Sequence, residues 1–252
     1  MMIALPRSLR HAVERHTVTR KILLGCGVVS SALYIAADII GTLRYPGYSW
    51  LDQEFSELTA QGAPTRPLMI ALVEFPYNLL VLAFAAGLWT LGGSKSRAAK
   101  LAAAGLVGYT VFGFVAGTIT PMTTREAMVA GEDTLRNAFH GPLTMVSDLL
   151  LAVGMAAAGQ LLGKRFRYYS YATIATLIVF GIWTGFQIPQ MQANEPTPWM
   201  GLKERVNIYA SMLWVAVLAV GLLRSGAPEP HPDLEQPAVN PPATRRHSKL
   251  PA

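Results

Sequence analysis

The sequence predicts an all-α membrane protein, a polytopic bundle of six transmembrane helices with both termini in the cytoplasm. Apolar segments occupy residues 22–43, 68–91, 101–120, 142–162, 169–190 and 206–223. Each is close to the roughly 20 residues with which a helix crosses a hydrocarbon core of about 30 Å. The composition agrees, since 52% of the residues are hydrophobic and only 14% are charged, against about a quarter charged in soluble domains.

The orientation follows from the basic residues, which fall mostly on alternate sides of the six segments. On the side of the termini these are Arg7, Arg10, Arg15, Arg20, Lys21, Lys95, Arg97, Lys100, Lys164, Arg165, Arg167, Arg224, Arg245, Arg246 and Lys249; on the other they are Arg44, Arg66, Arg125, Arg136, Lys203 and Arg205. Loops rich in Lys and Arg stay cytoplasmic. The net charge of +6 is therefore a topology signal, and we expect contact with membrane lipid and no nucleic acid.

The two ends of the chain differ from the membrane domain at 21–223. Residues 1–20 form a basic cytoplasmic segment, and we expect the first apolar run to be retained as a helix because no A-x-A-like cleavage site follows it. Residues 225–252 hold seven prolines and few large apolar side chains, a composition that predicts a disordered cytoplasmic tail. The lone cysteine, Cys26, lies in the first span, where we expect a small core residue.

The first outer loop has the pattern of a short amphipathic helix over residues 49–60. Ser49 is followed three residues later by Asp52, a capping-box-like start. Leu51, Phe55 and Leu58 then recur at helical spacing. We expect this helix to lie on the outer surface and to cover the bundle.

Small residues in the third and fourth spans predict close helix packing. Gly113 and Gly117 form a G-x-x-x-G in the third span, a spacing that lets helices approach closely in lipid. Packing within one bundle is the simpler interpretation, and a homodimer through the Gly113/Gly117 face is the alternative.

Polar residues inside the spans are the candidate functional residues, because a charge at mid-membrane costs roughly 2.5–3.5 kcal/mol even on the lenient insertion scale. The predicted ligand-binding set is Asp38, Glu74, Asn78, His140, Ser147 and Asp148. All fall in the outer half of the bilayer under the predicted topology, and on each helix they share one face. We expect them to meet in an outward-facing polar cup.

Three interpretations of this cup stay open: a structural polar network, a ligand or ion site, and catalysis. Catalysis has little support, since His140 is the only histidine in or at a span and a membrane metallohydrolase needs several such ligands. The chain carries no G-x-S-x-G elbow, no Walker loop and no dinucleotide fingerprint. We therefore expect no metal and no cofactor.

Two further segments resemble a known family. The outer loop reads Tyr48-Ser49-Trp50-Leu51-Asp52-Gln53-Glu54-Phe55-Ser56-Glu57-Leu58, and the last span opens with Gly201-Leu202-Lys203-Glu204-Arg205-Val206. With six spans and a histidine at the head of the fourth, the chain resembles the bacterial integral membrane protein family called domain of unknown function 998. That resemblance covers about Lys21–Leu223, and it implies a topology but no activity. It directs attention to Ser56, Glu57, Glu204 and Arg205, of which we expect Glu57 and Arg205 to pair.

A fainter resemblance is to lipid amidases of the ceramidase type, with Ser56, Asp148 and His140 as counterparts by residue type alone. The other histidine ligands of that family are missing here. The leading prediction is thus a non-enzymatic protein of the cell membrane that binds or senses a lipid or small polar ligand from outside. A small transporter or proton-coupled carrier that uses Asp38, Glu74 and Asp148 is the first alternative, and a membrane lipid hydrolase is the second.

Overall fold

The computed structural model describes residues 7–225, and the chain before and after them lies outside the description. The predicted tail at 225–252 therefore falls, apart from Ser225, outside the described residues. The long helices are α1 (Arg7–Arg44), α4 (Asn78–Trp89), α5 (Ser96–Phe114), α7 (Thr134–Ala158), α8 (Lys164–Gly185) and α10 (Met200–Arg224). The short ones are α2 (Phe55–Thr59), α3 (Arg66–Met69), η1 (Ile70–Tyr77), η2 (Gly93–Lys95), η3 (Val115–Ile119), α6 (Arg125–Val129) and α9 (Ile188–Gln192).

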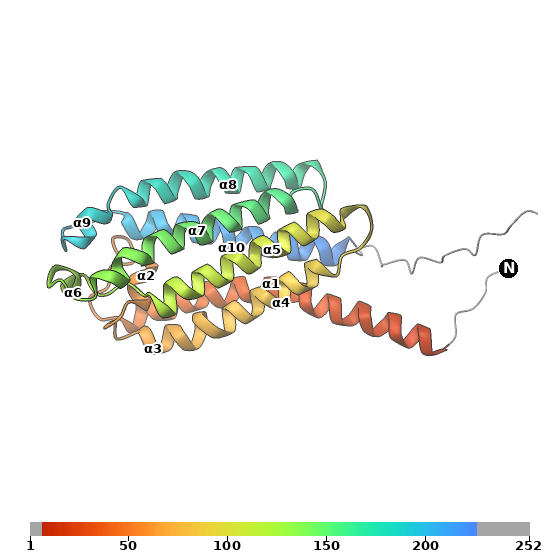
Figure 1. Ribbon diagram of the computed structural model, residues 1–252, viewed down its shortest axis with the longest axis horizontal. Coiled ribbons are helices and arrows are strands. Elements are labelled where there is room, and N and C mark those ends of the chain that lie inside the picture. The colour runs from red at the N-terminus through yellow and green to blue at the C-terminus, as the bar shows by residue number, and fades with distance from the viewer. Residues whose placement is uncertain (1–6, 226–252) are drawn as a thin grey trace, which may run out of the picture.

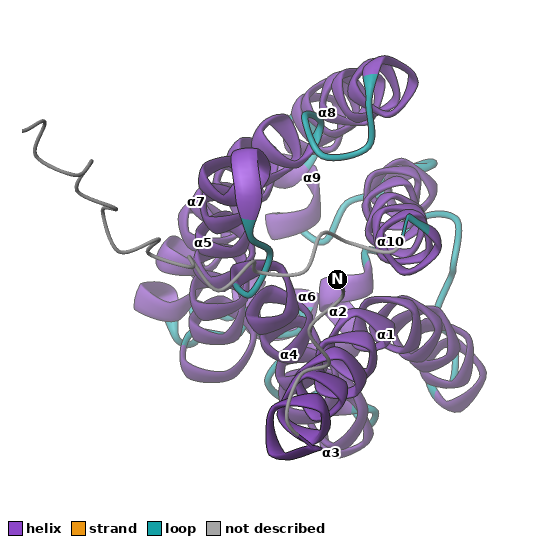
Figure 2. Ribbon diagram, turned by 90° about the vertical axis from the view of Figure 1, so that its right-hand side faces the viewer, coloured by secondary structure: helices purple, strands orange, loops and turns teal. Residues whose placement is uncertain are grey.

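The long helices run side by side as a bundle (Figures 1 and 2). Going round it, α1 packs on α4, α4 on α5, α5 on α7, α7 on α8 and α8 on α10, which returns to α1. The most extensive contact is between α5 and α7, and the contact between α7 and α8 is much smaller. Apolar residues such as Leu24, Phe84 and Trp214 are buried between these helices.

Among the described residues, five helical segments are long and apolar enough to cross a membrane: Thr17–Arg44, Arg66–Trp89, Ser96–Ile119, Thr134–Ala158 and Met200–Arg224. The chain is thus a multi-pass membrane protein with an all-α fold. The predicted span at 169–190 corresponds to α8, which is less apolar because Tyr168, Tyr169 and Tyr171 occupy its first turns. The second and third spans each combine an α-helix with a π-helical stretch, η1 and η3.

Short helices and loops cover one end of the bundle, which we call the capped end. α2, α3, α6 and α9 lie there, whereas α1 begins and α10 ends at the opposite end (Figure 1). The predicted 49–60 helix is shorter than expected. Ser49 and Asp52 instead close a turn, in which the Ser49 hydroxyl donates to Asp52 at 2.9 Å, and α2 begins only at Phe55.

The fourth span begins earlier than predicted, because α7 starts at Thr134. His140 therefore lies almost two turns inside the helix and not at its head. This displacement decides what the imidazole contacts, as described below.

Glycines allow the close approach of α5 and α7. A Cβ on Gly105 would lie 2.6 Å from the Gly154 Cα and 2.7 Å from the Leu150 carbonyl oxygen. Gly113 and Gly117 also face inward, toward the Ser147 hydroxyl and the Glu74 carboxylate respectively. The structure thus uses these glycines for packing within one chain, and a homodimer through the Gly113/Gly117 face stays a prediction.

We expect Gly105→Ala to destabilise the protein by about 1–3 kcal/mol, because the added methyl group meets backbone that cannot move without separating two helices. Gly25→Ala is the matched control, since nothing lies within 4 Å of a Cβ at that position. Thermal unfolding in detergent should show a lower midpoint for the first variant alone. Equal midpoints for both variants would contradict the tight α5–α7 contact.

Candidate functional site

A buried ion pair joins α1 to α10 beneath the capped end. Arg205 donates to Asp38 through two parallel bonds, Nε to Oδ2 at 2.9 Å and Nη2 to Oδ1 at 2.8 Å. Both side chains are only 1% exposed. The Tyr209 hydroxyl, one turn further along α10, also donates to Asp38. Two-point pairing of this kind fixes the guanidinium in a single orientation.

Arg205 also holds the loop above it. Its Nη1 donates to the carbonyl oxygens of Trp50 and Gln53, each at 3.0 Å, and its Nη2 donates to the Tyr48 hydroxyl at 2.7 Å. The guanidinium carbon lies 4.9 Å from the centroid of the Trp50 ring. One arginine therefore connects two spans with the segment that covers them.

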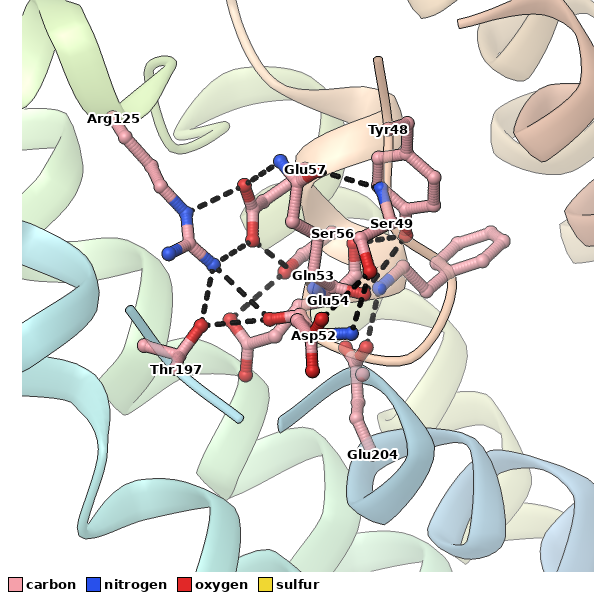
Figure 3. A network of polar contacts seen from close by, with 12 residues as sticks. Tyr48, Ser49, Asp52, Gln53, Glu54, Ser56, Glu57, Arg125, Thr197 and Glu204 are labelled. Atoms are coloured by element: carbon pink, nitrogen blue, oxygen red, sulfur yellow. Dashed lines mark hydrogen bonds and ion pairs between the residues drawn. The ribbon is translucent and has the colours of Figure 1, made fainter. Parts of the chain in front are cut away.

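The predicted pair between Glu57 and Arg205 is wrong, because Glu57 binds a different arginine. Arg125 of α6 donates to Glu57 from Nε at 2.8 Å and from Nη2 at 2.6 Å. The side chains are 10% and 5% exposed. Figure 3 shows that Arg125 approaches the segment at 48–57 from one side and Glu204 approaches it from another. In the sequence, Arg125 is one of several loop charges, and no neighbouring residue distinguishes it.

The ion pair between Arg125 and Glu57 also contacts a third segment of the capped end, at 197–199. Nη2 of Arg125 donates to the Thr197 hydroxyl at 3.0 Å, which donates in turn to the carbonyl oxygen of Asp52 at 2.7 Å. The Asp52 carboxylate accepts from the backbone N–H of Trp199 at 2.9 Å. The segments at 49–57, 125 and 197–199 are thereby fixed relative to one another.

The motif that opens α10 has a clear structural role. Glu204 accepts the backbone N–H of Phe55 at the start of α2. Gly201 allows the loop to approach, because a Cβ there would lie 2.2 Å from the Gln53 carbonyl oxygen. Ser56, also selected from the sequence, makes only a long contact of 3.4 Å with Glu54.

A polar pocket of about 380 Å³ opens among these fixed loops. It is lined by Tyr45, Gly47, Gln53, Glu57, Thr124, Arg125, Glu126, Asn194, Glu195 and Pro196. Three glutamates and one arginine thus line it, and the arginine is already bound to Glu57. The pocket has an excess of negative charge.

Two titratable groups of the capped end have raised pKa values, chiefly because they are buried. Burial raises the pKa of Tyr45, and the carboxylates of Glu126 and Glu57 raise it further. Burial and the neighbouring Glu57 raise the pKa of Glu54 to about 7. Burial is the larger cause of both shifts, and the neighbouring carboxylates add to it because they disfavour a further negative charge.

The predicted residue Glu74 lies in a second cluster, where the two π-helical stretches meet. Its carboxylate accepts the Thr118 hydroxyl at 2.9 Å and lies against Gly117. Asn78 donates to the backbone carbonyl of Glu74 at 2.8 Å and not to its carboxylate. Arg66 donates to the carbonyl oxygens of Thr59 and Gly117, which ties this cluster to α2.

The three predicted residues of α7, His140, Ser147 and Asp148, each have different surroundings. His140 lies with Nδ1 3.0 Å from the Ala116 carbonyl oxygen and 3.2 Å from that of Thr120, where η3 ends. Ser147 donates to the Tyr109 carbonyl oxygen at 2.8 Å. Within the described part of the chain, the half-buried Asp148 carboxylate has no hydrogen-bond partner, and it acts electrostatically on Tyr77 and Tyr109.

Tyrosines lie between the polar stripes of the spans. Tyr34 packs edge-on against Tyr77 with ring centroids 4.8 Å apart, and the Tyr77 and Tyr109 hydroxyls lie 2.9 Å from each other. Neither of the two hollows described in this structure is lined by Asp38, Glu74, His140 or Asp148. Ligand binding by these four residues therefore stays a prediction. Among the described residues, no group of three or more His, Cys, Asp or Glu side chains is placed to hold a metal ion.

Comparison with known families gives one match. The model of a family described as "Protein of unknown function (DUF998)" matches residues 28–221. The chain belongs to this family. The match covers both motifs singled out in the sequence and all the contacts described above, and it confirms the resemblance. Searches of curated proteins and of solved structures found no match.

Proposed function

We propose that this DUF998 protein is a non-enzymatic membrane protein that binds a small polar ligand with a cationic group in the polar pocket, from outside the cell. The observation that carries the proposal is the pocket's charge. Glu57, Glu126 and Glu195 face a hollow in which Arg125 is the one lining cation among the described residues. An ammonium group would supply the missing positive charge.

The chemistry of the walls fits an ammonium compound. Tyr45 supplies an aromatic ring beside the carboxylates, and cations bind favourably to such faces. Gln53 and Asn194 supply amide oxygens that accept hydrogen bonds. The pocket volume of about 380 Å³ lies within the roughly 300–1,000 Å³ of small-molecule sites.

The ion pairs around the pocket favour a preformed site. Because Arg125 is bound to Glu57, to Thr197 and to backbone carbonyls, a ligand need not order these loops itself. Binding then costs less conformational entropy. We infer a sensor or receptor subunit in preference to a carrier, since the loops around the pocket are tied down at several points.

The proposed topology has α8 as a sixth span and the capped end outside. α8 has 22 residues, about 33 Å of helix, and lies along α7 and α10. Cations at the other end include Lys95, Lys100 and Lys164, which fits the positive-inside rule. Three arginines of the capped end, Arg66, Arg125 and Arg205, are engaged by protein oxygens.

Cysteine labelling tests this topology in whole cells. In a Cys26→Ser background we expect Glu132→Cys, at the capped end, to react with a membrane-impermeant maleimide. Lys164→Cys, at the exposed first residue of α8, should react only after the membrane is opened. The reverse pattern, or labelling of both positions in intact cells, would contradict the proposed orientation.

The ligand class is tested by thermal stability in detergent. Small ammonium compounds, such as choline and putrescine, should raise the unfolding temperature of the wild type, whereas carboxylates of similar size should not. The Glu126→Gln/Glu195→Gln variant should lose this stabilisation. Glu132→Gln, which removes an exposed carboxylate outside the pocket, is the matched control and should keep it. No shift with any ammonium compound would count against the proposal.

A further inference from the structure

A second hollow lies between α8 and α10 and has the opposite character. Its volume is about 820 Å³. The walls are mainly apolar, with Phe180 and Trp183 from α8, Phe186 directly after it, and Leu202 and Val206 from α10. We call it the aromatic groove. It shares no lining residue with the polar pocket.

One cation stands in this apolar groove. Lys203 is 6% exposed; its Nζ lies 5.2 Å from the centroid of the Trp183 ring and contacts the amide oxygen of Gln187. Glu54 acts on it electrostatically, yet among the described residues no carboxylate forms an ion pair with Lys203. An ammonium group held only by a neutral amide and a ring has capacity for an anion.

The groove also contains a strained tryptophan. Trp199 has a φ of 63°, a left-handed conformation that is a genuine outlier for a bulky residue. Its backbone N–H donates to the Asp52 carboxylate at 2.9 Å. The residue lines the groove and is 58% exposed. Strain of this kind persists where the surrounding structure imposes it, commonly at functional sites.

We propose that the aromatic groove binds an anionic phospholipid. The acyl chains lie along Phe180, Trp183 and Phe186, and the phosphate lies at the Lys203 ammonium. The depth is appropriate, because the groove is at the capped end, and tryptophans with an adjacent lysine are typical of the membrane–water interface. The start of α10 at Met200 adds the positive end of a helix dipole on the same side.

Native mass spectrometry of the delipidated full-length protein tests this site. Titration with phosphatidylglycerol should give a saturable complex, and Lys203→Met should weaken it about tenfold, the usual worth of one charge-assisted contact. Lys100→Met is the matched control, because Lys100 also lies over a tryptophan ring, that of Trp89, at 6.0 Å. Equal affinities of the two variants would overturn the proposal.

Three further comparisons distinguish a bound lipid from other ligands. Val206→Trp fills the groove and leaves the charge in place, so it should also lose the lipid; unchanged binding would place the lipid elsewhere. Phosphatidylcholine with the same chains should bind at least several-fold more weakly, and an equal affinity would contradict selection by Lys203. Inorganic phosphate at the same concentration should not compete, whereas full competition would identify a site for free anions in place of a lipid.

Discussion

Arg205→Met is expected to lower the free energy of unfolding by about 3–5 kcal/mol, because it leaves the Asp38 carboxylate buried without its counter-ion. It also removes the donor that holds the carbonyl oxygens of Trp50 and Gln53, so the covering loop loses its attachment to α10. Thermal or denaturant unfolding in detergent measures the effect. We expect the largest loss of any single substitution at the capped end.

A double variant distinguishes an uncompensated charge from a simple loss of contacts. Asp38→Asn/Arg205→Met should be more stable than Arg205→Met alone, because a neutral amide then replaces the buried, unpaired carboxylate. Arg136→Met supplies the matched control. Arg136 and Asp133 form an ion pair whose side chains are 43% and 42% exposed, and such surface pairs contribute only about 0–1 kcal/mol. A double variant no more stable than Arg205→Met would refute the charge explanation.

Arg125→Met is expected to release the capped end locally. Since Arg125 links α6 to Glu57 and to Thr197, its loss should raise amide hydrogen exchange in the segments at 49–59 and 194–199, while the long helices stay protected. The expected destabilisation is again about 3 kcal/mol or more, because Glu57 is left buried.

A conservative variant tests whether this effect comes from charge or from geometry. Glu57→Gln keeps one acceptor for Arg125 and should raise exchange less than Arg125→Met does. Arg136→Met should leave exchange in both segments unchanged. If Arg125→Met raised exchange equally throughout the bundle, the Arg125–Glu57 pair would stabilise the whole fold and would not specifically hold the segments at 49–59 and 194–199.

The helices themselves were readily predictable, because apolar runs of span length have few alternative structures. The segments predicted at 22–43, 68–91 and 206–223 each lie largely within helices of the structure. Errors arose at the ends. Helix α7 begins at Thr134, eight residues before the predicted span at 142–162. Its first two turns are polar, so an apolar run does not mark them as part of the helix.

The candidate site was predicted less completely, because ion pairs between distant segments leave no local pattern. Arg205 and Tyr209 are four residues apart on one face of α10, a spacing that could have linked both to Asp38. Arg125 offered no comparable signal. The side chains of Asp38, Glu74 and His140 are each engaged by their own neighbours. The polar pocket is lined instead by residues of α2, α6 and the loops of the capped end.

The charge of the polar pocket is tested most directly by calorimetric titration with two molecules of the same shape, choline and its neutral carbon analogue 3,3-dimethylbutan-1-ol. The account predicts that choline binds at least tenfold more tightly, a difference of about 1.4 kcal/mol, and that Glu126→Gln/Glu195→Gln abolishes the difference. Equal affinity of the two molecules for the wild type, or no binding of either, would contradict the proposed recognition of a cationic ligand.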